Sequence, residues 1–201
     1  KTGIPQIDDL RWGSHIGLLY QTSSDLIEVL TPYFQAGLDG GEYCVWATAE
    51  PLTPEAAYEA LRQAVPDLDG YIQTGQLEII PDSQWHALSE RSGMAIYSKL
   101  DKAIASGYDG LRVACRADPM TKSGESYAHE SGTIGGYNVI GIFAYPRANL
   151  DASGLMEVSK RHRFALIRNG IHWDVIESSE AQILKDTLKS SEEKLQSLFS
   201  N

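Results

Sequence analysis

Short apolar runs alternate along the chain with longer stretches in which apolar residues recur every three or four positions. The runs are typical of strands buried on both faces, and the longer stretches are typical of amphipathic helices. The predicted strands cover residues 16–20, 43–48, 76–80, 111–115 and 138–145. Because strands that alternate with helices are joined by crossovers, we predict an α/β fold, a three-layer structure with a mainly parallel sheet and helices on both faces.

Capping residues set the limits of the predicted helices. The cluster Thr22-Ser23-Ser24-Asp25 is a typical N-cap, and Thr53-Pro54 is a typical helix start. The predicted helices run from these two starts to about residues 38 and 66, then over 94–106 and, less regularly, 126–134. Residues 164–169 and 172–176, separated by Gly170, indicate either a terminal hairpin or two short edge strands.

The hydrophobic period changes after residue 177. From Glu180 onward the a and d positions of a heptad are apolar except for Ser191. The apolar members are Ala181, Leu184, Leu188, Leu195 and Leu198. We therefore predict a domain over residues 1–177 and, over 178–201, a signalling helix that forms a coiled coil and makes the chain a homodimer. The alternative is a helix that folds back onto the core.

Charge and cysteine content narrow the class of protein. The formal net charge of -10 argues against nucleic acid or an anionic membrane surface as the partner. Cys44 and Cys115 each lie inside an apolar run without metal or redox spacing, so we expect two buried thiols. No apolar run reaches the roughly 18 residues of a membrane span, and no signal peptide is present, so we expect a cytoplasmic protein.

The first part of the chain resembles RecA/KaiC-like ATPases. The segments that carry this resemblance are TGIP (2–5), IDDL (7–10), GL (37–38), GE (41–42) and AE (49–50). Such ATPases have a glycine-rich loop ending in Gly-Lys-Ser/Thr after the first strand, where backbone N–H groups and a lysine hold phosphates. Here the corresponding stretch, Tyr20 to Asp25, has neither glycine nor lysine. We therefore expect no ATP at this position and interpret Thr22 to Asp25 as a helix cap.

The sequence has these RecA/KaiC-like features without the phosphate loop, and in this it resembles the MEDS sensory domain of methanogens, methylotrophs and the regulator DcmR. The resemblance covers roughly residues 14–177. It rests on HIGLLY (15–20), YFQAGL (33–38), GE (41–42), GQL (75–77), ASGYDGLR (105–112) and IRNG (167–170). It implies sensing of a small organic molecule, such as a C1 compound or hydrocarbon derivative, ahead of a histidine kinase or another output domain. Residues 116–120 depart from the acidic-aromatic pattern usual in the family, which puts the ligand chemistry in doubt.

Candidate binding residues follow from the place where open α/β sheets bind ligands, the carboxyl ends of the strands. The candidates there are Tyr20, Glu50, Trp85, Arg116, Asp118, Tyr145 and Arg147. Aromatic rings would form an apolar wall, the acidic residues could hold a cation, and Arg116 could pair with them or with an anion. The alternative for each charged residue is a structural ion pair.

The histidines and the potential nucleophiles give weaker evidence for a functional site. His15 and His162 recur in the MEDS pattern, which makes them binding candidates, although hydrogen-bonded core histidines are the alternative. No histidine pair has helical zinc spacing, and no catalytic serine or cysteine motif is present, so we expect no metal, no cofactor and no enzyme activity in this domain. The basic run at 160–163 is interpreted as a solvated face.

Three functional hypotheses follow. The first is a small-molecule input domain of a signal-transduction protein, with a downstream PAS, kinase or other output domain in the same chain. The second is a degenerate KaiC-like domain that still binds nucleotide, with Glu50 as the candidate general base of any residual catalysis. The third is a dimerisation scaffold whose former cleft is filled by side chains.

Overall fold

A seven-stranded sheet organises the chain in a computed structural model that describes residues 1–7, 9–92, 95–117 and 136–178. The strands are β1 (His15–Tyr20), β2 (Tyr43–Thr48), β3 (Leu77–Pro81), β4 (Leu111–Arg116), β5 (Val139–Pro146), β6 (Phe164–Asn169) and β7 (His172–Glu177). Their order is β3-β2-β4-β5-β1-β6-β7, and every pair is parallel except β6 with β7. The predicted α/β class with a mainly parallel sheet is confirmed.

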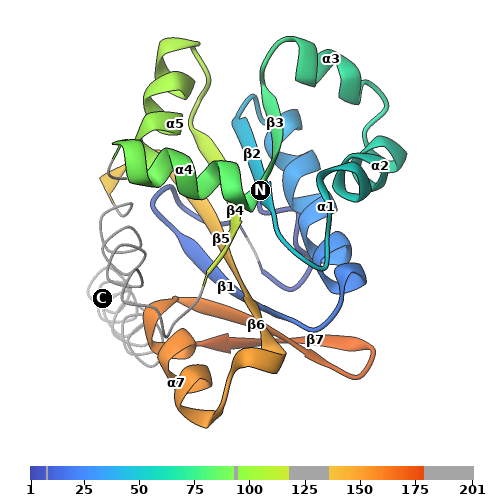
Figure 1. Ribbon diagram of the computed structural model, residues 1–201, viewed down its shortest axis with the longest axis vertical. Helices are drawn as coiled ribbons and strands as arrows, with labels where there is room; N and C mark the ends of the chain where they lie inside the picture. The colour runs from blue at the N-terminus through green and yellow to red at the C-terminus, as the bar shows by residue number, and fades with distance from the viewer. Residues whose placement is uncertain (8, 93–94, 118–135, 179–201) are drawn as a thin grey trace, which may run out of the picture.

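Helices cover both faces of this sheet (Figure 1). They are α1 (Ser23–Asp39), α2 (Pro54–Ala64), α3 (Leu68–Gln73), α4 (Asp82–Ser92), α5 (Ala95–Ala105) and α7 (Ala152–Arg161), with a 3-10 turn η2 (Arg147–Asn149). One core lies between the sheet and α1, α2 and α3, where Phe34 stacks on Trp46 with ring centroids 5.0 Å apart. The other lies against α4, α5 and α7 and includes Trp85, Ile96 and Val158. We call these the α1-side core and the α5-side core.

Three helices have no counterpart among the predicted elements. Helix α3 has six residues and contains Gly70, so it is too short for a period to emerge. Helix α4 has few apolar residues, of which Trp85 and Leu88 pack into the α5-side core. Helix α7 begins at the cap of Asp151, whose side chain accepts from the N–H of Gly154. The predicted helix at 126–134 and the predicted coiled coil at 178–201 lie outside the described residues.

The remaining local predictions agree with the structure. Residues 164–169 and 172–176 form the hairpin of β6 and β7, and Gly170 supplies the positive φ of 59° that its turn needs. Both cysteines are buried, and neither forms a disulfide with the other. Among the described helices, none is long and apolar enough to cross a membrane.

A buried ion pair ties the beginning of the chain to the sheet. The guanidinium of Arg112, on β4, donates to the carboxylate of Glu42 and to the backbone carbonyls of Lys1, Thr2 and Tyr33. Arg112 is fully buried, and its partners lie on the N-terminal segment, on α1 and just before β2. The role of this network is structural, because it lies at the opposite edge of the sheet from the carboxyl ends of the strands.

Candidate functional site

The turn between β1 and α1 occupies the place where a phosphate loop would lie. One carboxylate oxygen of Asp25 accepts hydrogen bonds from the backbone N–H groups of Gln21 (2.8 Å) and Thr22 (3.0 Å). The hydroxyl of Thr22 in turn accepts from the N–H of Asp25 at 3.2 Å, which completes a capping box. The predicted cap is confirmed. Two of the N–H groups that could hold an anion here already bind the chain's own carboxylate.

The carboxyl ends of β1, β2 and β4 meet beside this turn. Tyr20 is buried at the end of β1, and its hydroxyl donates to the backbone carbonyl of Glu50 at 3.3 Å. A cavity lined by Tyr20, Trp46, Leu52 and Arg116, among others, has a volume of about 10 Å³. That volume holds one water molecule at most. Among the described residues, side chains therefore fill most of the cleft predicted at this point, and the carboxylate of Glu50 is turned to solvent.

The first turn of α4 brings unpaired polar atoms to the same edge of the sheet. Trp85 is fully buried, and its indole N–H has no hydrogen-bond partner among the described residues. The Oδ1 atom of Asp82 is also buried and has no partner in the described part of the chain, whereas its Oδ2 atom lies 3.1 Å from Nε2 of His86. Trp85 follows Asp82 by three residues, so both project from one face of the helix. Trp85 thus belongs to a helix and to the α5-side core.

Charged side chains on the first turn of α4 and at the end of β4 act on the hydroxyl of Tyr20 at the end of β1. Burial raises the pKa of the Tyr20 hydroxyl, the guanidinium of Arg116 works in the opposite direction, and the carboxylate of Asp82 adds to the rise. Three polar side chains from β1, β4 and α4 are therefore close enough to affect one another. Two of them, Tyr20 and Arg116, were predicted, and Asp82 was missed although it lies two residues after a predicted strand.

Three predicted residues form a separate cluster under α7. Nδ1 of His15 lies 2.8 Å from Nδ1 of His162, and Nε2 of His162 lies 2.8 Å from the hydroxyl of Tyr145. The ring of Phe143 packs against His162 with centroids 5.5 Å apart. Gly17 makes room for this arrangement, because a Cβ atom there would lie 2.9 Å from Cδ2 of His162.

This cluster belongs to the α5-side core, whereas Tyr20 belongs to the α1-side core. Tyr20 and Tyr145, predicted to share one cleft, therefore lie on opposite faces of the sheet. Burial lowers the pKa of His15 to about 4. Burial, followed by the positive charges that His15 and Arg161 can carry, holds the pKa of His162 well below its usual value. Both rings are therefore neutral at pH 7.

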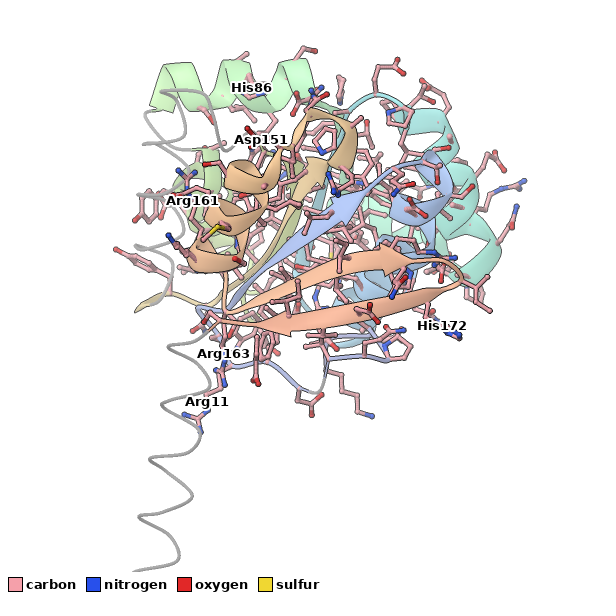
Figure 2. The ribbon with its side chains drawn as sticks, turned by 90° about the horizontal axis from the view of Figure 1, so that it is seen from below. Arg11, His86, Asp151, Arg161, Arg163 and His172 are labelled. Atoms are coloured by element: carbon pink, nitrogen blue, oxygen red, sulfur yellow. The ribbon has the colours of Figure 1, made fainter. Side chains whose placement is uncertain are left out.

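The remaining predictions concern Arg147, Asp118, the basic run at 160–163 and the expected lack of a metal site. Arg147 lies in η2 and donates to the carbonyl of Leu150 at 2.9 Å, which closes that turn. Asp118 lies outside the described residues. Arg161 and Arg163 extend from the end of α7 and the start of β6, as Figure 2 shows, while His162 between them is buried. In the described part of the chain, no group of three or more His, Cys, Asp or Glu could hold a metal ion.

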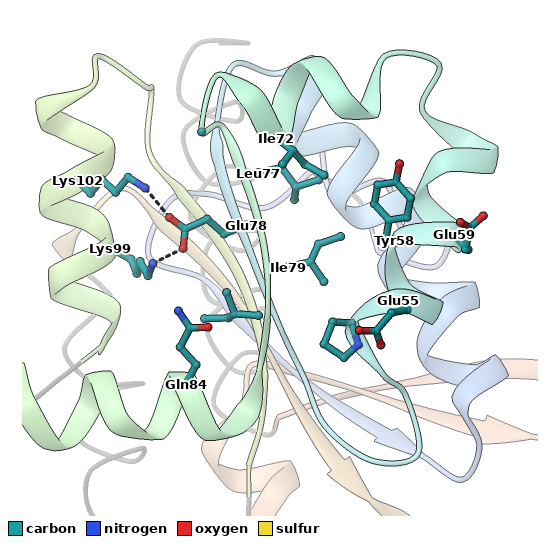
Figure 3. Close-up of a pocket in the computed structure, with 13 residues that line it drawn as sticks. Glu55, Tyr58, Glu59, Ile72, Leu77, Glu78, Ile79, Gln84, Lys99 and Lys102 are labelled. Atoms are coloured by element: carbon teal, nitrogen blue, oxygen red, sulfur yellow. Dashed lines mark hydrogen bonds and ion pairs between the residues drawn. The ribbon is translucent and has the colours of Figure 1, made fainter.

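A large open groove lies elsewhere, along the outer strand β3, and contains none of the predicted site residues (Figure 3). Its volume is about 870 Å³. The carboxylate of Glu78 on β3 accepts from Lys99 and Lys102 of α5 and from the hydroxyl of Tyr43. Although burial would raise it, hydrogen bonds from these three side chains hold the pKa of Glu78 at about 2. In the sequence, Glu78 is a charged residue inside a predicted apolar strand, and this signal could have revealed the groove.

Comparisons with known proteins agree with this architecture. Residues 14–163 match the family described as MEDS, the MEthanogen/methylotroph, DcmR Sensory domain. A search among curated proteins finds no match.

Two solved structures of archaeal proteins are similar in fold. The KaiC-like protein PH0186 from Pyrococcus horikoshii OT3 has a TM-score of 0.51 at 17% identity, over 87% of this chain and 84% of that one. The flagellar accessory protein FlaH from Methanocaldococcus jannaschii has a TM-score of 0.50 at 13% identity, over 86% and 81%. At these identities the likeness concerns the fold alone.

Proposed function

Because the chain belongs to the family of MEDS sensory domains, we propose that it is the input domain of a signal-transduction protein and binds a small organic ligand at the carboxyl edge of its sheet. The location is supported by two buried polar atoms on α4 that have no partner among the described residues, Nε1 of Trp85 and Oδ1 of Asp82. A buried polar group without a partner costs about 1–3 kcal/mol. A ligand that accepts from the indole and donates to the carboxylate would recover that cost.

The surroundings of these two atoms favour a small, partly apolar molecule. Trp85 packs in the α5-side core, and Asp82 lies close enough to Tyr20 and Arg116 to affect the Tyr20 hydroxyl together with the positive charge of Arg116. Glu50 and Asp118 stay candidates for holding a cationic ligand, and Arg116 for holding an anionic one. We propose C1 compounds and hydrocarbon derivatives as the first ligand class to examine.

Nucleotide binding is the second candidate, supported by the KaiC-like fold. The carboxylate of Asp25 argues against it, because it puts a negative charge where phosphate would bind and already accepts from two backbone N–H groups there. Titration calorimetry with Mg-ATP decides this point, because a heat of binding would restore the nucleotide hypothesis. A scaffold without a ligand is the third candidate, and the cavity of about 10 Å³ beside Tyr20 favours it.

We further propose that the signal leaves through residues 178–201, toward a histidine kinase or another output domain. The heptad pattern of that segment supports a parallel dimer in which ligand binding changes the register or rotation of the helices. A chain ending at Glu177 should be monomeric in sedimentation experiments, and a dimer that survives the truncation would contradict this assignment.

The experiment that tests the ligand site is a thermal-shift screen of the domain against C1 and methylated compounds, amines, thiols, small organic acids and nucleotides. Trp85→Phe keeps an aromatic ring but removes the indole N–H together with part of the ring system. Because this leaves a cavity in the core, the free variant should melt at a lower temperature than the parent, and each ligand-induced shift is measured against the variant's own melting temperature. The substitution should also abolish the shift produced by any compound that hydrogen-bonds to the indole.

Trp12→Phe, at a partly exposed tryptophan, is the matched control and should leave that shift intact. Asp82→Asn tests the second unpaired atom in the same way. A compound whose shift survives both Trp85→Phe and Asp82→Asn binds elsewhere, which would refute the proposed location. The absence of any shift across the screen would favour the scaffold.

A further inference from the structure

Strand β3 leaves one edge of the sheet open. It stands at the end of the strand order, and no described residue pairs with its outer side. The carbonyl of Gln76, just before β3, accepts from the N–H of Cys44 on β2 at 2.8 Å. Because successive residues of a strand direct their backbone polar groups to alternate sides, the N–H and C=O groups of Leu77 and Ile79 point away from β2.

The groove of about 870 Å³ follows this edge and has two different walls. On the side of α2 and α3 it is lined by Glu55, Tyr58, Glu59 and Ile72, and Figure 3 shows these side chains across from β3. On the side of α5, the lysines of the Glu78 network give the wall an excess of positive charge, because two ammonium groups face one carboxylate. The two walls therefore carry opposite charge.

The edge is recessed between the two layers of helices. Leu77 and Ile80 are buried, and Glu78 and Ile79 are only partly exposed, although the strand has no outer neighbour among the described residues. The same strand of a second copy would be equally recessed between its own helices, so two such edges could not meet. A single extended chain needs only about 5 Å of width beside β3 and could enter.

We propose that β3 binds an extended peptide segment as an additional strand. The peptide that fits presents acidic side chains to Lys99 and Lys102 at alternate positions. At the positions between them it presents apolar or basic side chains to Ile72 and the carboxylates of α2. Backbone hydrogen bonds to Leu77 and Ile79 supply the pairing, and the two walls supply the selectivity.

The test uses a fluorescein-labelled peptide, KEIEIEK, whose glutamates lie on one face of a strand and whose isoleucines and lysines lie on the other. The control peptide KEEIIEK has the same composition and charge but breaks the alternation. Fluorescence anisotropy with the full chain should show binding of KEIEIEK at least tenfold tighter than of KEEIIEK. Equal binding of the two peptides would overturn the proposal.

Two variants locate the binding site. Ile79→Pro removes an N–H group that points away from β2, so it should abolish peptide binding without removing a bond within the sheet. Lys102→Glu reverses a partly exposed charge of the groove and should weaken binding at least tenfold, whereas Lys160→Glu, at an exposed position of α7, should not. Circular dichroism checks that Ile79→Pro folds. If this variant does not fold, two modified forms of KEIEIEK, one N-methylated at its isoleucines and one at its glutamates, test the backbone pairing instead.

The outcomes separate the possible occupants of the edge. Peptide binding that survives Lys102→Glu and both N-methylated peptides would overturn the proposal. If the protein is a dimer that Ile79→Pro converts to a monomer while KEIEIEK fails to bind, then the occupant is a second copy of the chain and the proposal is wrong. None of these results depends on a ligand at Trp85.

Discussion

Nδ1 of His15 lies 2.8 Å from Nδ1 of His162, although the two residues are 147 positions apart in the chain. One of these nitrogens must donate and the other accept, so the contact excludes a proton on both. Nε2 of His162 is engaged as well, because the hydroxyl of Tyr145 lies 2.8 Å away. The pair joins the start of β1 to the end of α7, and its hydrogen bond cannot form when both rings are protonated.

Mild acid should therefore destabilise the domain. Folding lowers the pKa of His15 from 6.5 to about 4, so the unfolded chain binds the proton first as pH falls. The stability from this group is present above pH 6.5 and is lost progressively between pH 6.5 and about 4. From His15 alone we expect a loss of about 2 kcal/mol at pH 5, measured by urea unfolding at several pH values.

The double variant His15→Gln, His162→Gln is the control for this pH dependence. It should be less stable than the parent at pH 7 but should lose less stability between pH 7 and pH 5. A variant whose stability falls as steeply as that of the parent would show that other groups cause the loss.

Replacing Gly17 by alanine should destabilise the same cluster. The added Cβ would lie 2.9 Å from Cδ2 of His162 and 3.0 Å from a methyl group of Val158. His162 cannot turn away without losing its contacts to His15 and Tyr145, so we expect a loss of about 1–3 kcal/mol in chemical denaturation. Gly136→Ala should change little, because apart from its chain neighbours no atom of the described residues lies within 4 Å of the new Cβ.

Removing one partner of the buried ion pair should have a larger effect. Glu42→Gln leaves the guanidinium of Arg112 buried with its carbonyl partners but without a countercharge. We expect a loss of about 3–5 kcal/mol in the free energy of unfolding, measured with urea. Glu59→Gln breaks an exposed pair with Arg62 and should cost less than about 1 kcal/mol. Equal effects of the two substitutions would contradict a structural role for the buried pair.

The cap of α1 gives a further prediction. Asp25→Ala removes the carboxylate that accepts from the N–H groups of Gln21 and Thr22, and it should cost about 1–2 kcal/mol. Asp39→Ala makes the same chemical change at the other end of α1, where a negative charge opposes the helix dipole. It should leave stability unchanged or slightly raised, and thermal unfolding of the two variants compares them directly.

Local features of the fold were predictable from the sequence. The Thr22 to Asp25 cap, the hairpin turn at Gly170 and the burial of Cys44 depend on residues within a few positions of one another. The chemistry that determines them is therefore visible in a short stretch of chain. Helices α3 and α4 were not predicted, because one is too short and the other too polar for a helical period.

The candidate sites were predictable only in part. The rule that ligands bind at the carboxyl ends of strands selected Tyr20, Arg116 and Tyr145, but it cannot tell which face of the sheet a side chain takes. That choice placed Tyr145 with the two histidines and Tyr20 on the opposite face. Asp82 and the Glu78 network went unnoticed, because their importance comes from neighbours on other elements.

By itself the sequence determined the class of fold, the cap at the start of α1 and the two short strands on either side of Gly170. Only the tertiary structure decided that these strands form a hairpin, that β3 has no outer neighbour among the described residues and that His15 meets His162. Caps and turns are set by short-range hydrogen bonds and by backbone preferences of single residues. Strand order and contacts across 147 positions depend on how distant apolar surfaces are buried together, and no local pattern encodes that choice.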